Sequence, residues 1–235
     1  MPAVAAIIII TTTTTMTTTT RTTGLLRLQA WMSPAFPTGG FAYSHGLEWA
    51  IECGDIPNAP ALQVWLADVL RHGAGRTDAI LLRHAHRAAG DLSALRALAE
   101  LAAATAPGRE RRDESLNQGR AFVLAGDAWG TVMAPDDPAY PIAVGTTAGT
   151  HGIDDDATTA AFLQTFATNL ISAAVRLIPL GQTAGLHVLA ALEPIILDTA
   201  EATRDATLDD LGGCSFRSDL AAMRHETQYT RLFRS

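Results

Sequence analysis

Residues 157–178 read ATTAAFLQTFATNLISAAVRLI, and only one of these 22 residues, Arg176, is charged. A helix that is apolar on nearly all sides belongs in the core of a helical protein. The threonines and amides of the stretch make it too polar for the centre of a bilayer, so we expect a core helix rather than a membrane span. Its apolar row at helical spacing consists of Leu163, Phe166, Leu170, Ala174 and Leu177, with Phe162, Ile171 and Val175 beside it.

Further helical patterns lie on both sides of this stretch. Thr77 or Asp78 is an expected N-cap for one of them, and Asp91 for the next. Residues 134–152 are rich in proline and glycine and predict a loop, with a short apolar turn at 140–144. The other segments with helical spacing are 25–32, 41–54, 61–72, 77–89, 91–105, 110–126 and 183–204, the last with Pro194 inside.

The chain begins with a low-complexity run, MPAVAAIIIITTTTTMTTTTRTT, at residues 1–23. Its apolar part is too short to span a bilayer, and no basic region precedes it as in a signal peptide. We expect a disordered tail or a mis-called start upstream of Met16. No alternating strand pattern follows, so residues 24–235 predict one all-α domain, a helical bundle of roughly seven to nine helices.

The composition excludes several classes of function. A formal net charge of -7 argues against general nucleic-acid binding, which requires a basic face. The chain has no lysine, which excludes a Walker-A phosphate loop and Schiff-base chemistry. The two cysteines, Cys53 and Cys214, form no Cys-x-x-Cys pair and suit a reducing cytoplasm. Only 17% of the residues are charged, which indicates that part of the surface is an interface.

The C-terminal segment, residues 214–235, reads CSFRSDLAAMRHETQYTRLFRS and holds four arginines against two acids. Phe216, Leu220 and Met223 fall at i, i+4 and i+7, so a helix would align them on one face. A free terminus is normally polar, whereas this one is apolar, aromatic and rich in arginine. These residue types favour burial against the rest of the chain or against a partner.

Few residues suggest catalysis or metal binding. His84 and His86 could form a metal pair, but on a helix residues two apart point about 160° away from each other. Asp154, Asp155 and Asp156 could bind a cation; we expect them instead to cap the following helix. His45 follows Ser44 without a nucleophile elbow, which argues against a serine hydrolase.

Arg176 and Cys214 each allow two interpretations. An arginine on so apolar a helix must reach water or hydrogen-bond partners, so Arg176 either ties its helix to the following loop or faces a partner beside Gln182. Cys214 is either inert or a thiolate ligand for a soft or borderline metal. The nearby groups that could assist it are Asp209, Asp210 and His225.

Three well-separated segments resemble the UreF family of urease accessory proteins. They are SPAFPTGGFAYSHGLEWAIECG (33–54), SAAVRLIPLGQTAG (172–185) and DLAAMRHETQYTRLFRS (219–235), and they occur in the order of the family. The resemblance runs from about Leu25 to Ser235, and it implies an all-α homodimer with a non-catalytic chaperone role. UreF-like proteins act with UreD, also called UreH, and with the GTPase UreG to deliver nickel into apo-urease.

The resemblance also implies which residues bind partners. Tyr43, Glu48, Arg176 and Gln182 correspond to dimer and GTPase-facing surfaces. The C-terminal segment corresponds to the part that docks onto UreD. Cys214 lies where a transient nickel contact is plausible, but Gly212, two places before it, is no ligand, so no tightly bound cofactor is expected. The candidate partner-binding residues in the C-terminal segment are Arg217, Met223, Arg224, Tyr229, Arg231, Leu232 and Phe233.

The sequence therefore predicts a cytoplasmic assembly factor that bridges UreD and UreG and regulates GTP-dependent nickel delivery to apo-urease. No nucleic acid and no membrane are expected among its partners. The alternative is a stand-alone metal-dependent hydrolase that uses His84, His86 and the aspartates at 154–156.

Overall fold

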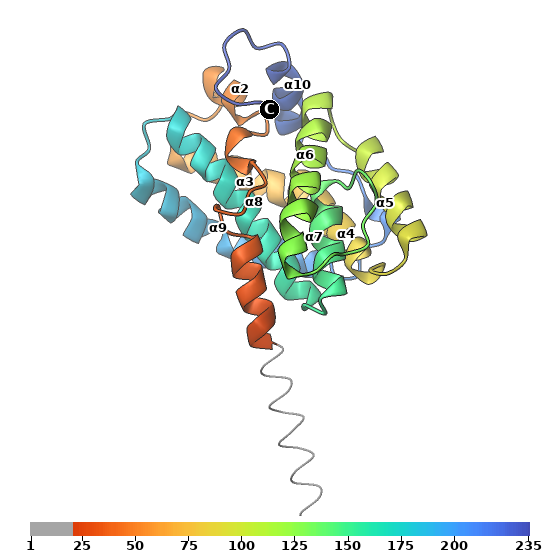
Figure 1. The fold of residues 1–235 in the computed structure, drawn as a ribbon. Coiled ribbons are helices and arrows are strands. Elements are labelled where there is room, and N and C mark those ends of the chain that lie inside the picture. The colour runs from red at the N-terminus through yellow and green to blue at the C-terminus, as the bar shows by residue number, and fades with distance from the viewer. Residues whose placement is uncertain (1–20) are drawn as a thin grey trace, which may run out of the picture.

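The computed structural model describes residues 21–235, and these residues are largely helical (Figure 1). No strand occurs among them, which confirms the all-α prediction, and nine α-helices, α2 to α10, follow a first helical stretch at residues 21–31. Of the predicted low-complexity tail, residues 1–20 lie outside the described part, and 21–23 belong to that first stretch. The α-helices are α2 (Leu47–Glu52), α3 (Ala59–His72), α4 (Ala74–Arg87), α5 (Leu92–Ala104), α6 (Arg109–Gly126), α7 (Tyr140–Thr150), α8 (Asp155–Leu177), α9 (Gln182–Ala202) and α10 (Phe216–His225).

Local signals explain most helix ends. Asp154 caps α8 by accepting the N–H of Ala157 at 2.9 Å, and Asp91 caps α5 in the same way, as the sequence predicts. The predicted cap at Thr77 or Asp78 is wrong, because α4 already begins at Ala74 and both residues lie inside it. A capping side chain has this effect only where the chain enters the helix, and here the chain enters after Gly73.

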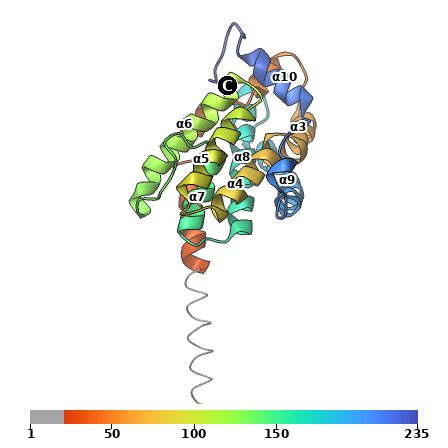
Figure 2. The same cartoon turned by 90° about the vertical axis from the view of Figure 1, so that its right-hand side faces the viewer.

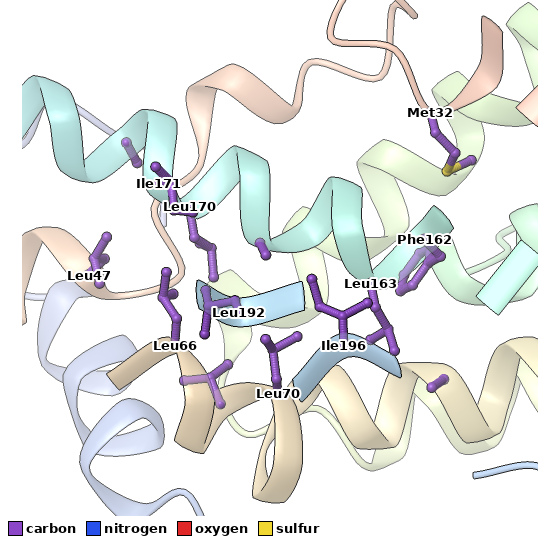
Figure 3. Close-up of a cluster of buried hydrophobic side chains, with 14 of the residues drawn as sticks. Met32, Leu47, Leu66, Leu70, Phe162, Leu163, Leu170, Ile171, Leu192 and Ile196 are labelled. Atoms are coloured by element: carbon purple, nitrogen blue, oxygen red, sulfur yellow. The ribbon is translucent and has the colours of Figure 1, made fainter. Parts of the chain in front are cut away.

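Helix α8 lies at the centre of the main core, as its composition predicts. It packs against α9, α3, α4 and α2, so that its apolar residues meet neighbours on several sides. Figure 3 shows Leu163 and Leu170 of α8 among side chains from α3 and α9, and all of them are almost completely excluded from water. Burial of this kind supplies most of the stability of a helical domain. The neighbouring side chains from α3 and α9 are Leu66, Leu70, Leu192 and Ile196.

Helix α7 corrects the prediction of a loop at 134–152. It is a full helix of 11 residues, buried along most of its length between α4 and α6. A Cβ atom on Gly145 would lie 2.2 Å from the carbonyl oxygen of Leu82, so only glycine allows α4 and α7 to approach this closely. Glycine and threonine have low helix propensity, which is why the segment looks like a loop in sequence.

Helix α9 is the one helix within residues 21–235 that is long and apolar enough to cross a membrane by length and composition alone. About 33% of its most apolar window is buried, on the face that packs against α3 and α8. Core helices of soluble proteins pass the same test, so this finding alone is weak evidence for a membrane span. Leu186 and Leu197 remain exposed on its outer face.

Candidate docking site

Helix α10 lies at one end of the molecule, against α2 and α6, and the end of the chain returns to the same place (Figures 1 and 2). Its two faces are inverted relative to an ordinary amphipathic helix. The face turned to the protein carries small or polar residues, whereas the large apolar residues Phe216, Leu220 and Met223 are exposed. The buried residues are Ser218, Ala221, Ala222 and His225.

A glycine at the turn before α2 allows α10 to lie so close. Gly46 has a φ of 76°, in the left-handed region, and a Cβ atom there would come within 2.4 Å of the backbone nitrogen of Ala222. Any larger residue would push α10 away from the turn. The backbone of α10 therefore packs directly against the motif SHG at 44–46.

The buried carboxylate of Glu48, in the first turn of α2, holds the segment that follows α10. It accepts the backbone N–H of Leu232 at 2.8 Å and that of Phe233 at 3.0 Å. The Nε2 atom of His225 lies 3.2 Å from the same carboxylate. One buried side chain thus fixes the end of α10 and the chain seven residues later.

The other ring nitrogen of His225 faces a second carboxylate. Its Nδ1 atom lies 2.7 Å from Glu110 at the start of α6, and Glu110 also pairs with the guanidinium of Arg231. The imidazole is completely buried between the two acids. We refer to Glu48, Glu110, His225 and Arg231 as the Glu48 cluster.

The last residues are anchored to the loop before α2. The Ser44 N–H donates to the carbonyl oxygen of Ser235 at 2.7 Å, and the Arg234 N–H donates to that of Ala42 at 2.8 Å. The hydroxyl of Ser235 donates to the buried carboxylate of Glu114. The C-terminal segment is therefore held by backbone and side-chain hydrogen bonds rather than by apolar packing alone.

Glu114 stands in a buried polar environment of its own. Burial opposes its ionisation, but the nearby Arg111 and His45 outweigh this and hold the pKa of the carboxyl well below its usual range. Burial and the charge of Arg111 lower the pKa of His45 to about 4, so this imidazole is neutral at physiological pH. His45 also has a φ of 63°, the only non-glycine residue among 21–235 in the left-handed region.

Arg176 connects the core helix to both parts of this site. Its guanidinium donates to the carbonyl oxygen of Phe41 at 2.8 Å and lies 4.3 Å from the centre of the Phe233 ring. Phe233 itself is buried. The sequence left two interpretations of Arg176 open, a tie between its helix and a loop or a contact with a partner. The structure shows a tie to a loop. The loop is the one at 40–42, however, and not the loop that follows α8.

The remaining large residues of the C-terminal segment face the solvent. Tyr229 is fully exposed, and Leu232 is 75% exposed although its backbone is fixed by Glu48. Five large apolar or aromatic side chains of the described chain are thus largely exposed on a backbone that hydrogen bonds hold in place. We call them the docking face: Phe216, Leu220, Met223, Tyr229 and Leu232.

The structure separates the other predicted partner-binding residues into two groups. Tyr43 and Glu48 are buried under the C-terminal segment, so they reach a partner only through it. Gln182 is exposed at the start of α9 and lines a groove of about 410 Å³ together with Phe41. Within the C-terminal segment, Arg217 pairs with Asp55 at 2.8 Å, Arg231 pairs with Glu110, and Arg224 is exposed.

No group of three histidine, cysteine or acidic side chains suited to a metal ion occurs within residues 21–235. Cys214 is exposed, and its expected helper His225 is buried in the Glu48 cluster instead. The Nε2 atoms of His84 and His86 lie at hydrogen-bond distance from backbone carbonyl oxygens, at 3.1 and 2.7 Å. These contacts leave both histidines with structural partners.

The three aspartates at the start of α8 are also structural. Asp154 is the N-cap, while Asp155 and Asp156 pair with the buried guanidinium of Arg83 at 3.1 and 2.9 Å. The expectation of an N-cap is confirmed for Asp154. Two of the acids proposed for the alternative hydrolase, Asp155 and Asp156, are therefore engaged in an internal ion pair.

Sequence comparison assigns the chain to a known family. Residues 56–193 match the family model described as UreF. The chain belongs to the UreF family. It is an accessory protein of urease and not an enzyme itself, so the alternative of a stand-alone hydrolase is wrong.

Curated relatives agree over nearly the whole length. A protein named urease accessory protein UreF from Rhodopseudomonas palustris (strain BisB5) is 52% identical over 225 residues, covering 92% of this chain and 93% of its own. A protein of the same name from Bradyrhizobium sp. (strain BTAi1 / ATCC BAA-1182) is 52% identical over 220 residues, covering 90% of this chain and 92% of its own. The resemblance seen in three short motifs thus extends to the full UreF-like domain.

Some residues of the site carry no signal in the sequence. Glu110 and Glu114 lie in a charged helix that looks like an ordinary solvated surface, yet both are largely buried against the C-terminal segment. Gly46 looks like a turn residue only. Their roles depend on contacts more than 100 residues away in the chain, which no local pattern reveals.

Proposed function

We propose that this chain bridges UreD and the GTPase UreG during urease assembly and regulates GTP-dependent nickel delivery to apo-urease. The observation that carries the proposal is the docking face, five large apolar side chains presented to solvent on a backbone held by buried hydrogen bonds. A surface that is apolar and already ordered loses little conformational freedom on binding. It suits a protein partner rather than a small substrate.

The chemistry of the docking face favours UreD as its partner. Aromatic residues, methionine and arginine are enriched at the centres of protein interfaces. Arg217, Arg224 and Arg231 belong to the same segment as the apolar side chains and supply the charged groups of this surface. The resemblance associates this same segment with UreD.

The groove beside α9 is a second surface, and we assign it to UreG and to a second copy of the chain. It contains Gln182 and the exposed Phe41, with Leu186 on the rim. Arg176 lies between this groove and the docking face and contacts both sides. A homodimer that uses this groove leaves both copies of the docking face free for UreD.

Nickel is cargo in this proposal, not a resident cofactor. Cys214 is an exposed thiol that belongs to no group of three potential metal ligands in the described chain, which suits transient contact only. Titration of the purified chain with nickel by calorimetry tests this. A sub-micromolar site would contradict it.

We assign the chain to the cytoplasm, without a membrane or nucleic acid among its partners. The net charge of -7 disfavours binding to the phosphate backbone. The buried face of α9 packs into the core through Val188, Leu192 and Ile196, which gives its apolar residues a partner within the protein.

Co-purification with tagged UreD is the direct test of the docking face. The double variant Leu220→Asp, Met223→Asp places two charges on exposed positions of α10 and should abolish co-purification without changing thermal unfolding. Leu124→Asp on α6 is the matched control, since Leu124 is 80% exposed but lies outside the docking face.

The outcomes separate clearly. If the double variant still binds UreD as well as wild type does, the docking face is not the UreD site. If Leu124→Asp weakens binding equally, the effect is not specific to α10. Urease activation in cells that carry the same variants should follow the binding result.

A further inference from the structure

We propose that Glu226 is a positioning residue for partner docking. Its side chain caps helix α6 from the end of helix α10, and so holds the C-terminal turn of α10, with Met223 of the docking face, in place. This inference rests on the proposed function of the docking face and adds a contact that sets the orientation of its helix. Glu226 is the C-cap residue of α10 and directly follows its last turn.

Helix α6 has no capping side chain at its own N-terminus. Its N-cap residue is Gly108, which has no side chain to accept the first N–H groups of the helix. By contrast, Asn58, Asp91 and Asp154 cap α3, α5 and α8 with their own side chains. The first four N–H groups of an α-helix lack a partner within the helix, so those of α6 depend on an acceptor from elsewhere or on water.

The carboxylate of Glu226 supplies such an acceptor. Its Oε1 atom accepts the backbone N–H of Arg109 at 2.9 Å and that of Glu110 at 3.3 Å. A carboxylate at this position also interacts favourably with the positive end of the helix dipole. The side chain of Glu226 is 22% exposed, so the contact is partly shielded from water. The guanidinium of Arg109 is mostly exposed and 3.9 Å away, so this charge pair contributes little.

The same contact places Met223 beside the start of α6. A Cβ atom built on Gly108 would lie 3.2 Å from Oε1 of Glu226 and 3.7 Å from Cγ of Met223. The glycine at 108 therefore leaves room for the capping carboxylate and for one side chain of the docking face. If the end of α10 moved away from α6, Met223 would move with it.

Other contacts also hold α10 and the chain after it, but none of them accepts the first N–H groups of α6. They keep the helix attached when Glu226 is lost, while its C-terminal turn is held less firmly against α6. We therefore expect loss of Glu226 to weaken docking rather than to abolish it. The other contacts are the Arg217–Asp55 pair, the approach of Ala222 to Gly46, the contacts of His225 with Glu48 and Glu110, the Gln228–Glu52 hydrogen bond and the Arg231–Glu110 pair.

A cap introduced on α6 itself separates the two consequences of losing Glu226. Asn58 caps α3 from a backbone with φ of -159° and ψ of 175°, and Gly108 has nearly the same backbone, with φ of -168° and ψ of 169°. Gly108→Asn can therefore cap α6 locally, and removal of the carboxylate in Glu226→Ala leaves room for the new side chain. The double variant Gly108→Asn, Glu226→Ala restores a cap to α6 but no bond between α6 and α10.

Thermal unfolding and hydrogen exchange of the isolated full-length chain test the contact without any partner. Glu226→Ala should lower the melting temperature by about 2–4 °C and speed exchange of the last amides of α10, at 223–225, about tenfold. The double variant should regain the melting temperature but not the slow exchange. Glu100→Ala, at an exposed glutamate of α5, is the matched control and should stay close to wild type in both measurements. Unchanged exchange in Glu226→Ala, or slow exchange regained in the double variant, would overturn the inference.

Binding to immobilised UreD then links the contact to docking. Glu226→Ala should weaken binding about fivefold, and the double variant should stay weak although its stability has returned. Glu226→Gln keeps an oxygen that can accept the same N–H groups, so its affinity should lie close to that of wild type.

Three results of the binding experiment are decisive. If affinity returns together with stability in the double variant, Glu226 acts only on the stability of α6, and the positioning role is wrong. If Glu226→Gln loses as much affinity as Glu226→Ala, the charge acts on the partner directly, and the positioning role is again wrong. If wild type itself does not bind UreD, the proposed function fails, while the exchange result still decides whether Glu226 holds the end of α10.

Discussion

Helices α7 and α10 are of similar length but have opposite surfaces. Helix α7 buries apolar residues such as Ile142 and Val144 and approaches α4 so closely that Gly145 cannot be replaced without a clash. Helix α10 buries Ala221 and His225 and exposes its large apolar residues. The first is held by close packing, and the second by hydrogen bonds and charge pairs that leave its apolar surface free.

The comparison of α7 with α10 distinguishes residues that stabilise the fold from residues that are available for binding. Close packing is sensitive to volume and insensitive to pH. A contact made of hydrogen bonds to buried carboxylates depends on particular polar groups, while the exposed apolar side chains beside it contribute little to folding. Changes in α7 should therefore alter stability, and changes on the docking face should alter binding.

The largest effect is expected at Gly145. Gly145→Ala places a methyl group 2.2 Å from the backbone oxygen of Leu82, and neither helix can move without disturbing the core. We expect about 3 kcal/mol of destabilisation, measured by chemical unfolding. The matched control is Gly126→Ala on α6, where a Cβ meets nothing within 4 Å and a small gain is expected. Equal stability of Gly145→Ala and wild type would show that close packing of α7 against α4 does not limit the residue at position 145.

The next effect concerns binding alone. Leu220→Asp as a single change should reduce UreD affinity about tenfold or more, because a charge replaces an exposed apolar contact of the docking face. Its effect on unfolding should stay within about 0.5 kcal/mol. Isothermal calorimetry with UreD and thermal unfolding give the two values. A large loss of stability would show that Leu220 belongs to the core rather than to the docking face.

Asp78 on α4 makes the stability of the fold depend on pH, through its carboxyl group rather than through the packing itself. Burial, opposed by Arg111 and aided by Glu114, raises the pKa of Asp78 to about 7 from 3.8. The folded state thus binds the proton more tightly than the unfolded state, so stability falls as pH rises from about 4 to about 7. Asp78 is only partly buried and lines a pocket, so water weakens the effect.

Asp78→Asn removes this dependence. Relative to wild type it should gain about 1–2 kcal/mol between pH 4 and pH 8, measured by urea unfolding at each pH. The test compares the unfolding free energies of the variant and wild type at each pH. The lowered pKa of His45, about 4, makes stability rise with pH in both proteins, and this contribution cancels in the difference. Parallel curves for Asp78→Asn and wild type would contradict the prediction.

The smallest effect is expected at Arg176, which joins the two regions. Arg176→Ala loses a hydrogen bond to Phe41 and the contact with the Phe233 ring, about 1 kcal/mol for exposed groups. Thermal unfolding should change slightly, while exchange at the Phe233 amide should rise. Arg176→Lys keeps the charge but not the planar guanidinium, so its thermal stability and its Phe233 amide exchange should lie between those of wild type and Arg176→Ala. No change in either measurement would show that Arg176 does not link the core to the C-terminal segment.

Local signals in the sequence predicted most of the fold. The spacing of apolar residues indicated α3, α8 and α9, and Asp91 and Asp154 marked the starts of α5 and α8. They failed at α7, because its helix is stabilised by contact with α4 rather than by propensity. They also failed at Thr77 and Asp78, where capping residues lie inside a helix.

The site was predicted in composition but not in arrangement. The spacing of Phe216, Leu220 and Met223 indicated one shared face, yet it could not show whether that face is buried or exposed. The buried roles of Glu48 and Glu110 likewise required contacts across more than 100 residues. Assignment of these residues to partners stays a prediction.

Periodicity, caps and short motifs act within a few residues, so the amino-acid sequence indicated most of the helices and the family that the chain resembles, but not α7 or the start of α4. Which face of α10 is covered and which acids surround His225 became clear only from the folded structure, since burial depends on what packs there from elsewhere in the chain. On an isolated helix every face is in contact with water. The other helices of the fold decide which of these faces becomes buried.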